Sequence, residues 1–573
     1  MQPRRASAAA AESGSGWSRT LVTLGPGKDM VSTITYRTHC APVSRRRAGP
    51  AGCVRPFVSL VKIDMQSDHN ESHEPAKTEV VRPPEADTEA QTFCYSDEQK
   101  LGVFSVASLV LNKMIGSGRP VFSTPAAVFR STGSIGVSLL FWFVGGVLAF
   151  CGLSIWLEFG LAIPRSGGEK NYLERVYRRP KYLTTCVLAA QMVLLGFSTG
   201  NAIDFGQFIV DACNAVVANE TWAERAIATG CVTFAVVLHG VFPQWGIRLM
   251  NVVGLFKVIF MLVIAFSGVA ALAGYRGTDD PHNFDDSFSK MDMERYGKGG
   301  FRGYSSALLS VIYSFSGWET ANYVLSEVRN PRRTLAIAAP LAVGTVTILY
   351  MLANIAYFAA VDKLELVMSD VTVAAIFFKN MFGESAADKT LPVFVAVSSL
   401  GGVLAASFSH SRLTQELGKE GILPFGKFWA SNSPCNAPAL FLHWIVTVIV
   451  LVAPPTVYSQ AWINTLVTLG LIYLHLNKSE SWKSPWHTYI PISMVFLLFN
   501  GLLMIGPFVP PVPSSLDWNR FFLFPLIGIA ILFFGVLYWA VWIKAVPRVR
   551  GYRIETERVF DGDEVVQYRR VRY

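Results

Sequence analysis

The sequence has few charged residues for its length and no grouping of side chains that would serve catalysis or bind a metal. Charged residues make up only 16% of the 573 residues, well below the share usual in soluble domains. The eight cysteines form no CxxC pair and no Cys/His spacing typical of a metal site. The histidines are dispersed, with no GxSxG motif and no paired carboxylates near them. The sequence therefore predicts no enzyme, no metal site and no cofactor.

Long apolar runs dominate the chain instead. Hydrophobic residues make up 51%, and the mean hydropathy is +0.36. Runs of about 20 apolar residues, enough to span a bilayer as a helix, recur from residue 101 to residue 545. This pattern predicts an all-α polytopic membrane domain over 101–545. Residues 1–100 are expected to be a disordered tail, in which Met65 is an alternative start site, and 546–573 a short tail.

The apolar runs and their charged flanks predict about twelve transmembrane helices. Their expected positions are 101–129, 134–163, 183–211, 224–242, 247–274, 304–325, 334–361, 391–415, 438–454, 460–476, 487–510 and 520–545.

Basic residues indicate how the chain is oriented. The net charge is +9, but the basic side chains lie in short loops between apolar runs and form no single patch, which argues against a nucleic-acid partner. They gather after the even-numbered crossings, as with Arg178, Arg332, Lys478 and Arg548. By the positive-inside rule that side, with both termini, is cytoplasmic. Asn219 heads a glycosylation sequon on the opposite side, which is either modified or a chance match.

Two crossings contain residues that interrupt a helix. Residues 114–125 read MIGSGRPVFSTP, and residues 313–319 read YSFSGWE, five crossings later. Matching interruptions in two halves are typical of an inverted-repeat secondary transporter with its substrate site at the breaks. A half-helix N-terminus suits a carboxylate, and freed carbonyl groups suit an ammonium group. The alternative is that the glycines only allow close helix packing.

Several longer motifs carry a resemblance to a known family. They are EFGLAIPRSGGEKNYLERVYRRPKYL at 158–183, YSFSGWETANYVLSEVRNPRRTL at 313–335 and GKEGILPF at 418–425, with IGSG and FSTP at 115–125. The chain resembles the amino acid–polyamine–organocation superfamily, and within it the L-type branch to which fungal methionine permeases belong. The resemblance covers about 100–545. It implies a five-plus-five inverted-repeat fold with two extra C-terminal helices, and transport of a neutral L-amino acid, methionine or another large one.

The resemblance also implies which residues bind the substrate. The carboxylate is expected on backbone amides near Ser117 and Gly118, beside Ile115 and Gly116. The amine is expected on carbonyl groups around Tyr313, Ser314 and Ser316, with the Tyr313 ring as a gate. Phe315, Gly317 and Trp318 complete the predicted set, the last two shaping the break and the side-chain pocket.

The first break departs from the family pattern. Arg119-Pro120-Val121 stands where relatives have one short apolar residue, an apparent insertion of two. Arg119 would add a cation, and Pro120 would remove an amide. Three explanations are open at this point: a changed substrate preference, a misplaced exon boundary, or a transporter that has lost activity.

Lys257 lies several residues inside an apolar run of the fifth crossing, beginning at Asn251, that is otherwise free of charge. A lysine there costs about 2.5–3.5 kcal/mol to insert unless it has a partner or snorkels toward Arg248. In several family members a lysine at this point replaces a sodium ion. The resemblance therefore implies transport that is sodium-independent and coupled to protons, because a buried lysine releases its proton more readily.

The sequence leaves two other functions and one partner open. A sodium-independent exchanger and a non-transporting amino-acid sensor are the alternative functions. Animal L-type members pair with a glycoprotein through an outer cysteine, and Cys213 lies near that place. We nevertheless expect the chain to work without such a subunit, in the plasma membrane.

Overall fold

The structure is a computed structural model that divides into two compact units, Met1–Asp87 and Thr88–Tyr573. It describes residues 17–20, 34–37, 100–116, 119–196, 198–213, 220–275, 277, 280–289, 300–368, 372–431, 436–452, 460–505, 518–561 and 563–572. In the first unit, β1 (Trp17–Thr20) pairs antiparallel with β2 (Ile34–Arg37). The second unit contains all of the described helices.

The first five predicted crossings each coincide with described helices. They are α1 (Val103–Met114), α2 (Arg119–Phe122) and α3 (Thr124–Thr132) in the first, α4 (Ile135–Ala162) in the second, α6 (Leu183–Leu195) and α7 (Thr199–Cys213) in the third, α8 (Glu220–Val241) in the fourth and α9 (Pro243–Leu272) in the fifth.

Described helices also coincide with the remaining seven predicted crossings. They are α10 (Gly300–Ser314) with η3 (Trp318–Tyr323), α11 (Pro331–Ala360), α14 (Leu391–Lys419), α16 (Ala437–Val452), α17 (Gln460–Leu476), α18 (Ile490–Ile505) and α19 (Trp518–Trp539). Seven described spans are long and apolar enough to cross a membrane, and shorter apolar helices accompany them. The protein is thus a polytopic helical membrane protein.

Short elements connect or follow these helices. They are α5 (Glu169–Val176), η4 (Leu325–Glu327), α12 (Lys363–Met368), α13 (Val373–Phe382), η5 (Ala386–Thr390), α15 (Gly426–Trp429), η6 (Lys478–Glu480), η8 (Ala540–Ala545), α20 (Val546–Arg550), and the antiparallel hairpin of β3 (Tyr552–Asp561) and β4 (Asp563–Arg572). The described strands therefore lie outside the membrane part, in the two terminal regions.

Local sequence accounts for several helix ends. Pro243 and Pro331 stand in the first turn of α9 and α11, where their missing N–H groups are not needed. The side chain of Ser134 accepts a hydrogen bond from the Val137 amide and caps the start of α4. The long helices pack through small residues, and the Cα of Gly268 in α9 faces Ala356 in α11.

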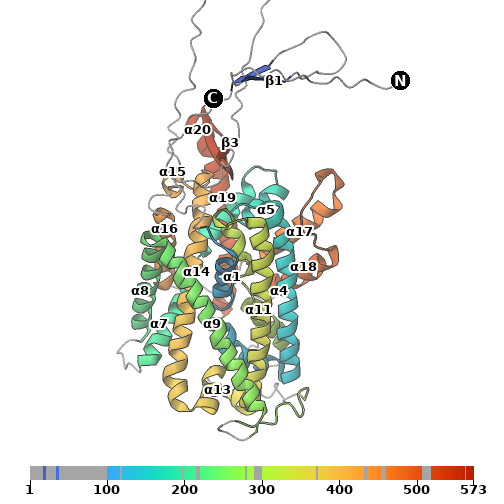
Figure 1. The fold of residues 1–573 in the computed structure, drawn as a ribbon, viewed down its shortest axis with the longest axis vertical. Helices are drawn as coiled ribbons and strands as arrows, with labels where there is room; N and C mark the ends of the chain where they lie inside the picture. The colour runs from blue at the N-terminus through green and yellow to red at the C-terminus, as the bar shows by residue number, and fades with distance from the viewer. Residues whose placement is uncertain are drawn as a thin grey trace, which may run out of the picture. The chain divides into compact units, whose positions relative to one another are not determined.

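The half-helix α1 lies inside the bundle and packs against α9, α11 and α14 (Figure 1). Its Val106, Leu109 and Val110 side chains are fully buried. Because helices surround it, the end of α1 at the break is kept from lipid. This is the condition under which unwound backbone is tolerated at membrane depth.

Candidate functional site

The last carbonyl groups of α1 are held by side chains from neighbouring helices. Lys257 Nζ, from α9, donates to the carbonyl oxygens of Asn112 at 3.2 Å and Ile115 at 3.3 Å. Ser398 Oγ, from α14, donates to the same Ile115 oxygen at 3.0 Å. The side chain of Lys257 is only 2% exposed, and its two hydrogen bonds place the ammonium group at the break. These side chains satisfy carbonyl groups that the end of a helix leaves without intrahelical partners.

Tyr350 of α11 connects the two broken crossings. Its hydroxyl hydrogen is shared between the carbonyl oxygens of Met114 at 2.9 Å and Ser314 at 3.3 Å. Met114 is the last residue of α1, and Ser314 is the last residue of α10. The two breaks therefore face each other across one buried phenol. The only signal of this link in the sequence was that the polar hydroxyl of Tyr350 stands within the apolar run 334–361.

Gly317 brings the two breaks into direct contact. Its φ is +120°, and an added Cβ would lie 2.8 Å from Lys113 Cγ and 3.1 Å from the backbone nitrogen of Met114. Only glycine avoids both the backbone strain and the clash. The Gly317 amide donates to Glu319 Oε2 at 3.0 Å, and the Glu319 carboxylate attracts the Lys113 ammonium group.

The predicted substrate residues around the first break are described only in part. Ile115 and Gly116 lie at the end of α1, both buried, and the Gly116 amide donates to the Lys113 carbonyl at 3.3 Å. Ser117 and Gly118, expected to bind the carboxylate, lie outside the described residues.

The predicted residues of the second break fall into two groups. Tyr313, with a 58% exposed side chain, and Ser316 are exposed, three residues apart. The rings of Phe315 and Tyr350 pack with their centroids 5.2 Å apart, and those of Trp318 and Trp156 of α4 with their centroids 5.0 Å apart. Phe315 and Trp318 are thus buried against neighbouring helices.

Backbone carbonyls at the second break differ in their remaining capacity. The Tyr313 oxygen already accepts from the amide and the hydroxyl of Ser316, at 3.1 Å and 2.7 Å. The Ser314 oxygen, which is shared with Tyr350, has room for a further donor. Ser314 is therefore the better placed of the two to receive an ammonium group.

The insertion in the first break forms α2, a short turn of helix. Arg119 and Pro120 lie in it, although their side chains are outside the described part. Val121 and Phe122 are buried, 3% and 2% exposed. The backbone thus accommodates the insertion as the first turn after the break, and a proline is tolerated there because no intrahelical partner is required of it.

Two glycines of α14 allow close packing against the first break. A Cβ on Gly402 would lie 2.3 Å from Asn201 Nδ2 and 2.9 Å from the Cα of Gly116. A Cβ on Gly401 would lie 2.2 Å from Asn112 Oδ1. Sequence reasoning did not identify these residues, because a Gly-Gly pair inside an apolar helix has several uses.

The third crossing is interrupted as well, which sequence reasoning missed. It was predicted as one helix over 183–211, but α6 ends at Leu195 and α7 begins at Thr199. Buried His443 of α16 holds the gap: its Nδ1 bonds the Gly196 carbonyl at 3.0 Å, and its Nε2 lies 3.2 Å from Ser198 Oγ. The sequence signals of this interruption were Gly196 and the presence of His443 inside the ninth crossing.

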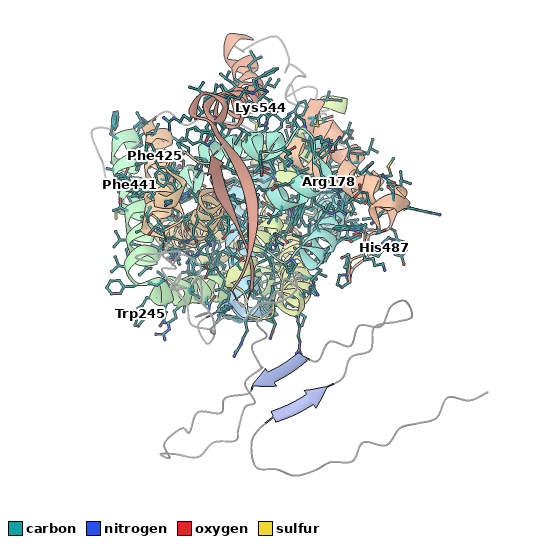
Figure 2. The ribbon with its side chains drawn as sticks, turned by 90° about the horizontal axis from the view of Figure 1, so that it is seen from above. Arg178, Trp245, Phe425, Phe441, His487 and Lys544 are labelled. Carbon is teal, nitrogen blue, oxygen red and sulfur yellow. The ribbon has the colours of Figure 1, made fainter. Side chains whose placement is uncertain are left out.

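Glu158 connects the end of α4 to the segment between α17 and α18. Its Oε1 lies 2.6 Å from His475 Nε2 and accepts from the Trp482 indole at 2.9 Å. Its Oε2 accepts from the Thr488 amide at 2.7 Å. His487 offers a third ligand-type atom within 4.8 Å, but the carboxylate oxygens are already engaged as an interhelical link. His487 and Arg178 lie on the same side of the bundle (Figure 2).

A helical bundle with two facing, interrupted crossings, five helices apart and joined at their breaks, is a secondary transporter of the broken-helix type. Comparison with known proteins shows the family to which this transporter belongs. The profile of the amino acid permease family matches residues 101–533, and the chain belongs to that family.

Individual relatives agree with this assignment. The chain is 35% identical over 540 residues to the high-affinity methionine permease of Saccharomyces cerevisiae, covering 89% of this chain and 92% of the relative. It is 28% identical over 480 residues to the low-affinity methionine permease of the same yeast, covering 79% and 84%. It is 26% identical over 463 residues to the b(0,+)-type amino acid transporter 1 of Mus musculus, covering 79% and 91%. Amino acid transport is therefore the shared activity of the family to which the chain belongs.

Proposed function

We propose that the chain carries methionine, or another large neutral L-amino acid, across the plasma membrane by alternating access, coupled to protons and independent of sodium. The substrate rests on the two methionine permeases among its relatives. The remaining features rest on the geometry around α1.

The position of Lys257 is the single observation that carries the sodium independence. Freed carbonyl oxygens at a half-helix end are the groups with which transporters of this type coordinate Na⁺. Here the carbonyl oxygens of Asn112 and Ile115 accept from a buried ammonium group instead. A positive charge in this place removes the need for a sodium ion and would repel one. This supports sodium independence.

A small cavity beside Lys257 supports a role for protons. It measures about 10 Å³, close to the volume that one water molecule needs. Lys257 and Ser398 are the polar residues of its lining, which is otherwise apolar and includes Ile115 and the rings of Phe122 and Phe260. A water molecule there could exchange a proton with Nζ, whereas an amino acid side chain would not fit.

The substrate would bind between the breaks. Backbone amides after Gly116 would hold the carboxylate, and the Ser314 carbonyl would accept from the amine. The exposed Tyr313 ring, one turn away, is suited to close over the site. The proposed orientation places both termini in the cytoplasm, and no heavy-chain subunit is required.

The test is uptake of radiolabelled methionine in yeast cells that lack their own methionine permeases. The chain is compared with a variant in which Arg119-Pro120-Val121 is replaced by one Ile, and each is assayed in sodium and in choline buffers. We expect saturable uptake that is equal in the two buffers, and that falls when a protonophore is added.

The two forms distinguish the explanations of the insertion. Uptake by both forms would show that α2 tolerates it. Uptake by the shortened form alone would mean that the insertion comes from a misplaced exon boundary or has inactivated the transporter. No methionine uptake by either form, with both at the cell surface, would contradict the proposal.

A further inference from the structure

The carboxyl group of Glu169, at the start of α5, is fully buried yet poorly satisfied. Its Oε1 accepts from the Tyr323 hydroxyl at 3.0 Å and from Gln460 Nε2 at 3.4 Å. Its Oε2 has no hydrogen bond of ordinary geometry within the described part of the chain, although the Trp156 indole and the Glu169 amide face the carboxyl group. An ionised carboxylate in such a place would leave acceptor positions empty, which is costly in a buried site.

No described residue that acts on the Glu169 carboxyl supplies a positive charge. Glu319 and Tyr323 face it from η3, and Tyr172 lies near on α5 itself. From α17 it meets the neutral amide of Gln460. The nearest cation in sequence, Lys170, forms an ion pair with Glu420 instead. Burial, and then repulsion by Glu319, raise the pKa of the Glu169 carboxyl to about 8.

On α6, the thiol of Cys186 faces the other side of α5, where Glu174 acts on it. On that side Lys170 forms a buried ion pair with Glu420, just beyond the end of α14, and lies 3.9 Å from Glu174. Arg175, near the end of α5, pairs with Glu480 at 2.9 Å, so the cations of α5 are engaged away from Glu169. One side is an ion pair with α14, and the other side is the lone carboxyl against η3.

The segment that carries Glu169 closes one end of the sixth crossing. The Gly168 amide donates to the Asn322 carbonyl at 3.2 Å, and the Tyr172 hydroxyl donates to Asn322 Oδ1 at 2.9 Å. Ser166 and Ser326 exchange hydrogen bonds between hydroxyl and amide, at 2.9 Å and 3.2 Å. Since η3 starts directly after the break at Gly317, movement of this segment is linked to the substrate site.

We infer that Glu169 is a proton-binding residue of the transport cycle and carries its proton only while α5 is closed on η3. The proton reaches it from the substrate side, past Glu319. When α5 moves away, water reaches the carboxyl, the O–H bond breaks, and the proton leaves to cytoplasmic water as the carboxylate forms. This inference rests on the proposed function, specifically on its proton coupling.

The direction of the pH dependence follows from the two states. The closed state has its pKa near 8, and a hydrated carboxyl has the ordinary value of 4.5. The closed state thus binds a proton that the open state releases. Lowering the pH from 8 to 4.5 progressively favours the closed segment, and raising it favours opening. At cytoplasmic pH, opening is coupled to proton release.

The test uses the purified full chain in proteoliposomes, with radiolabelled methionine. Accumulation is driven by a proton gradient, with the outside of the vesicles more acidic than the inside. Exchange is measured without a gradient, in vesicles that contain unlabelled methionine. We expect Glu169→Gln to retain exchange but to lose gradient-driven accumulation, with the internal-to-external ratio falling to about one. Glu169→Asp keeps a titratable group and should accumulate. Glu174→Gln, on the same helix, is the matched control and should accumulate as the unmodified chain does.

The outcomes separate this inference from the proposed function. If the unmodified chain ignores the pH gradient, proton coupling itself is wrong. If it responds and Glu169→Gln responds equally, only the role of Glu169 is wrong. Loss of exchange in Glu169→Gln, or loss of accumulation in Glu169→Asp, would show that the carboxyl serves folding or closure, and would also overturn the inference.

Discussion

At the scale of single residues, Tyr350 offers a direct measure of how strongly the two breaks are held. Replacing it by Phe removes the hydrogen shared by the Met114 and Ser314 carbonyls and leaves both without that donor. Hydrogen bonds inside membrane proteins contribute about 0.5–2 kcal/mol. We expect Tyr350→Phe to lower the thermal stability of the detergent-purified protein and to reduce methionine uptake.

Tyr357, seven residues later on α11, is the matched control. It is as deeply buried as Tyr350, but its hydroxyl has no hydrogen-bond partner in the described part of the chain. Tyr357→Phe should therefore leave stability unchanged or raise it. Equal effects of the two substitutions would mean that the Tyr350 hydroxyl does not hold the breaks.

Lys257 provides the second prediction at this scale. Lys257→Met keeps most of the side-chain volume but removes the ammonium group that holds the Asn112 and Ile115 carbonyls. Losing hydrogen bonds from a charged donor costs about 1.5–3 kcal/mol. Methionine uptake, corrected for surface expression, should fall at least about tenfold. Uptake near the level of the unmodified chain would remove Lys257 from the coupling mechanism.

Residues could be predicted from sequence where a charge or a break stands out against an apolar background. Lys257 is such a case: its ammonium group lies at the end of α1, and its role in coupling stays a prediction. Tyr350, Ser398 and His443 gave weaker signals, because a lone polar residue in a helix is usually satisfied within its own turn or by a neighbour. Their partners lie more than thirty residues away in sequence, so only the fold reveals them.

At the scale of secondary-structure elements, the contact between α14 and the first break is sensitive to one added methyl group. Gly402→Ala would place a Cβ 2.3 Å from Asn201 Nδ2 and 2.9 Å from the Gly116 backbone. Overpacking of this kind costs about 1–3 kcal/mol. We expect lower thermal stability and a marked loss of uptake.

Gly344 in α11 is the comparison for this prediction. An alanine Cβ there would lie 3.6 Å from Phe150 Cζ, an ordinary contact. Alanine also favours a helix by about 1 kcal/mol over glycine. Gly344→Ala should leave uptake intact and stability unchanged or higher. If Gly402→Ala behaves in the same way, α14 is not tightly packed on the break.

The twelve crossings were predictable because a membrane requires long apolar runs, and the runs show directly in the sequence. The interruption between α6 and α7 was not, since Gly196 and Ser198 are common in membrane helices and only the bond from His443 distinguishes them. The hairpin of β3 and β4 was also missed. Its residues alternate in no strongly apolar pattern, and a short tail gave no reason to expect strands.

At the scale of the whole molecule, Cys213 can test the proposed orientation. It lies at the end of α7 and is a free, exposed thiol. If that end of α7 faces outward, a membrane-impermeant maleimide should label intact cells, and Cys213→Ser should abolish the labelling. Labelling only after the membrane is permeabilised would reverse the orientation. A covalent partner that disappears on reduction or in Cys213→Ser would contradict function without a subunit.

The shared hydrogen bond of Tyr350 also restricts how the transporter can move. Because one phenol spans both breaks, and Gly317 lies against Lys113, the two half-helices cannot separate without breaking this link. They should move together with α11 as one rigid body, while the surrounding helices rotate relative to them. Distances between spectroscopic labels on α1 and η3 would then stay constant through the cycle, and the changes would appear between α1 and α5.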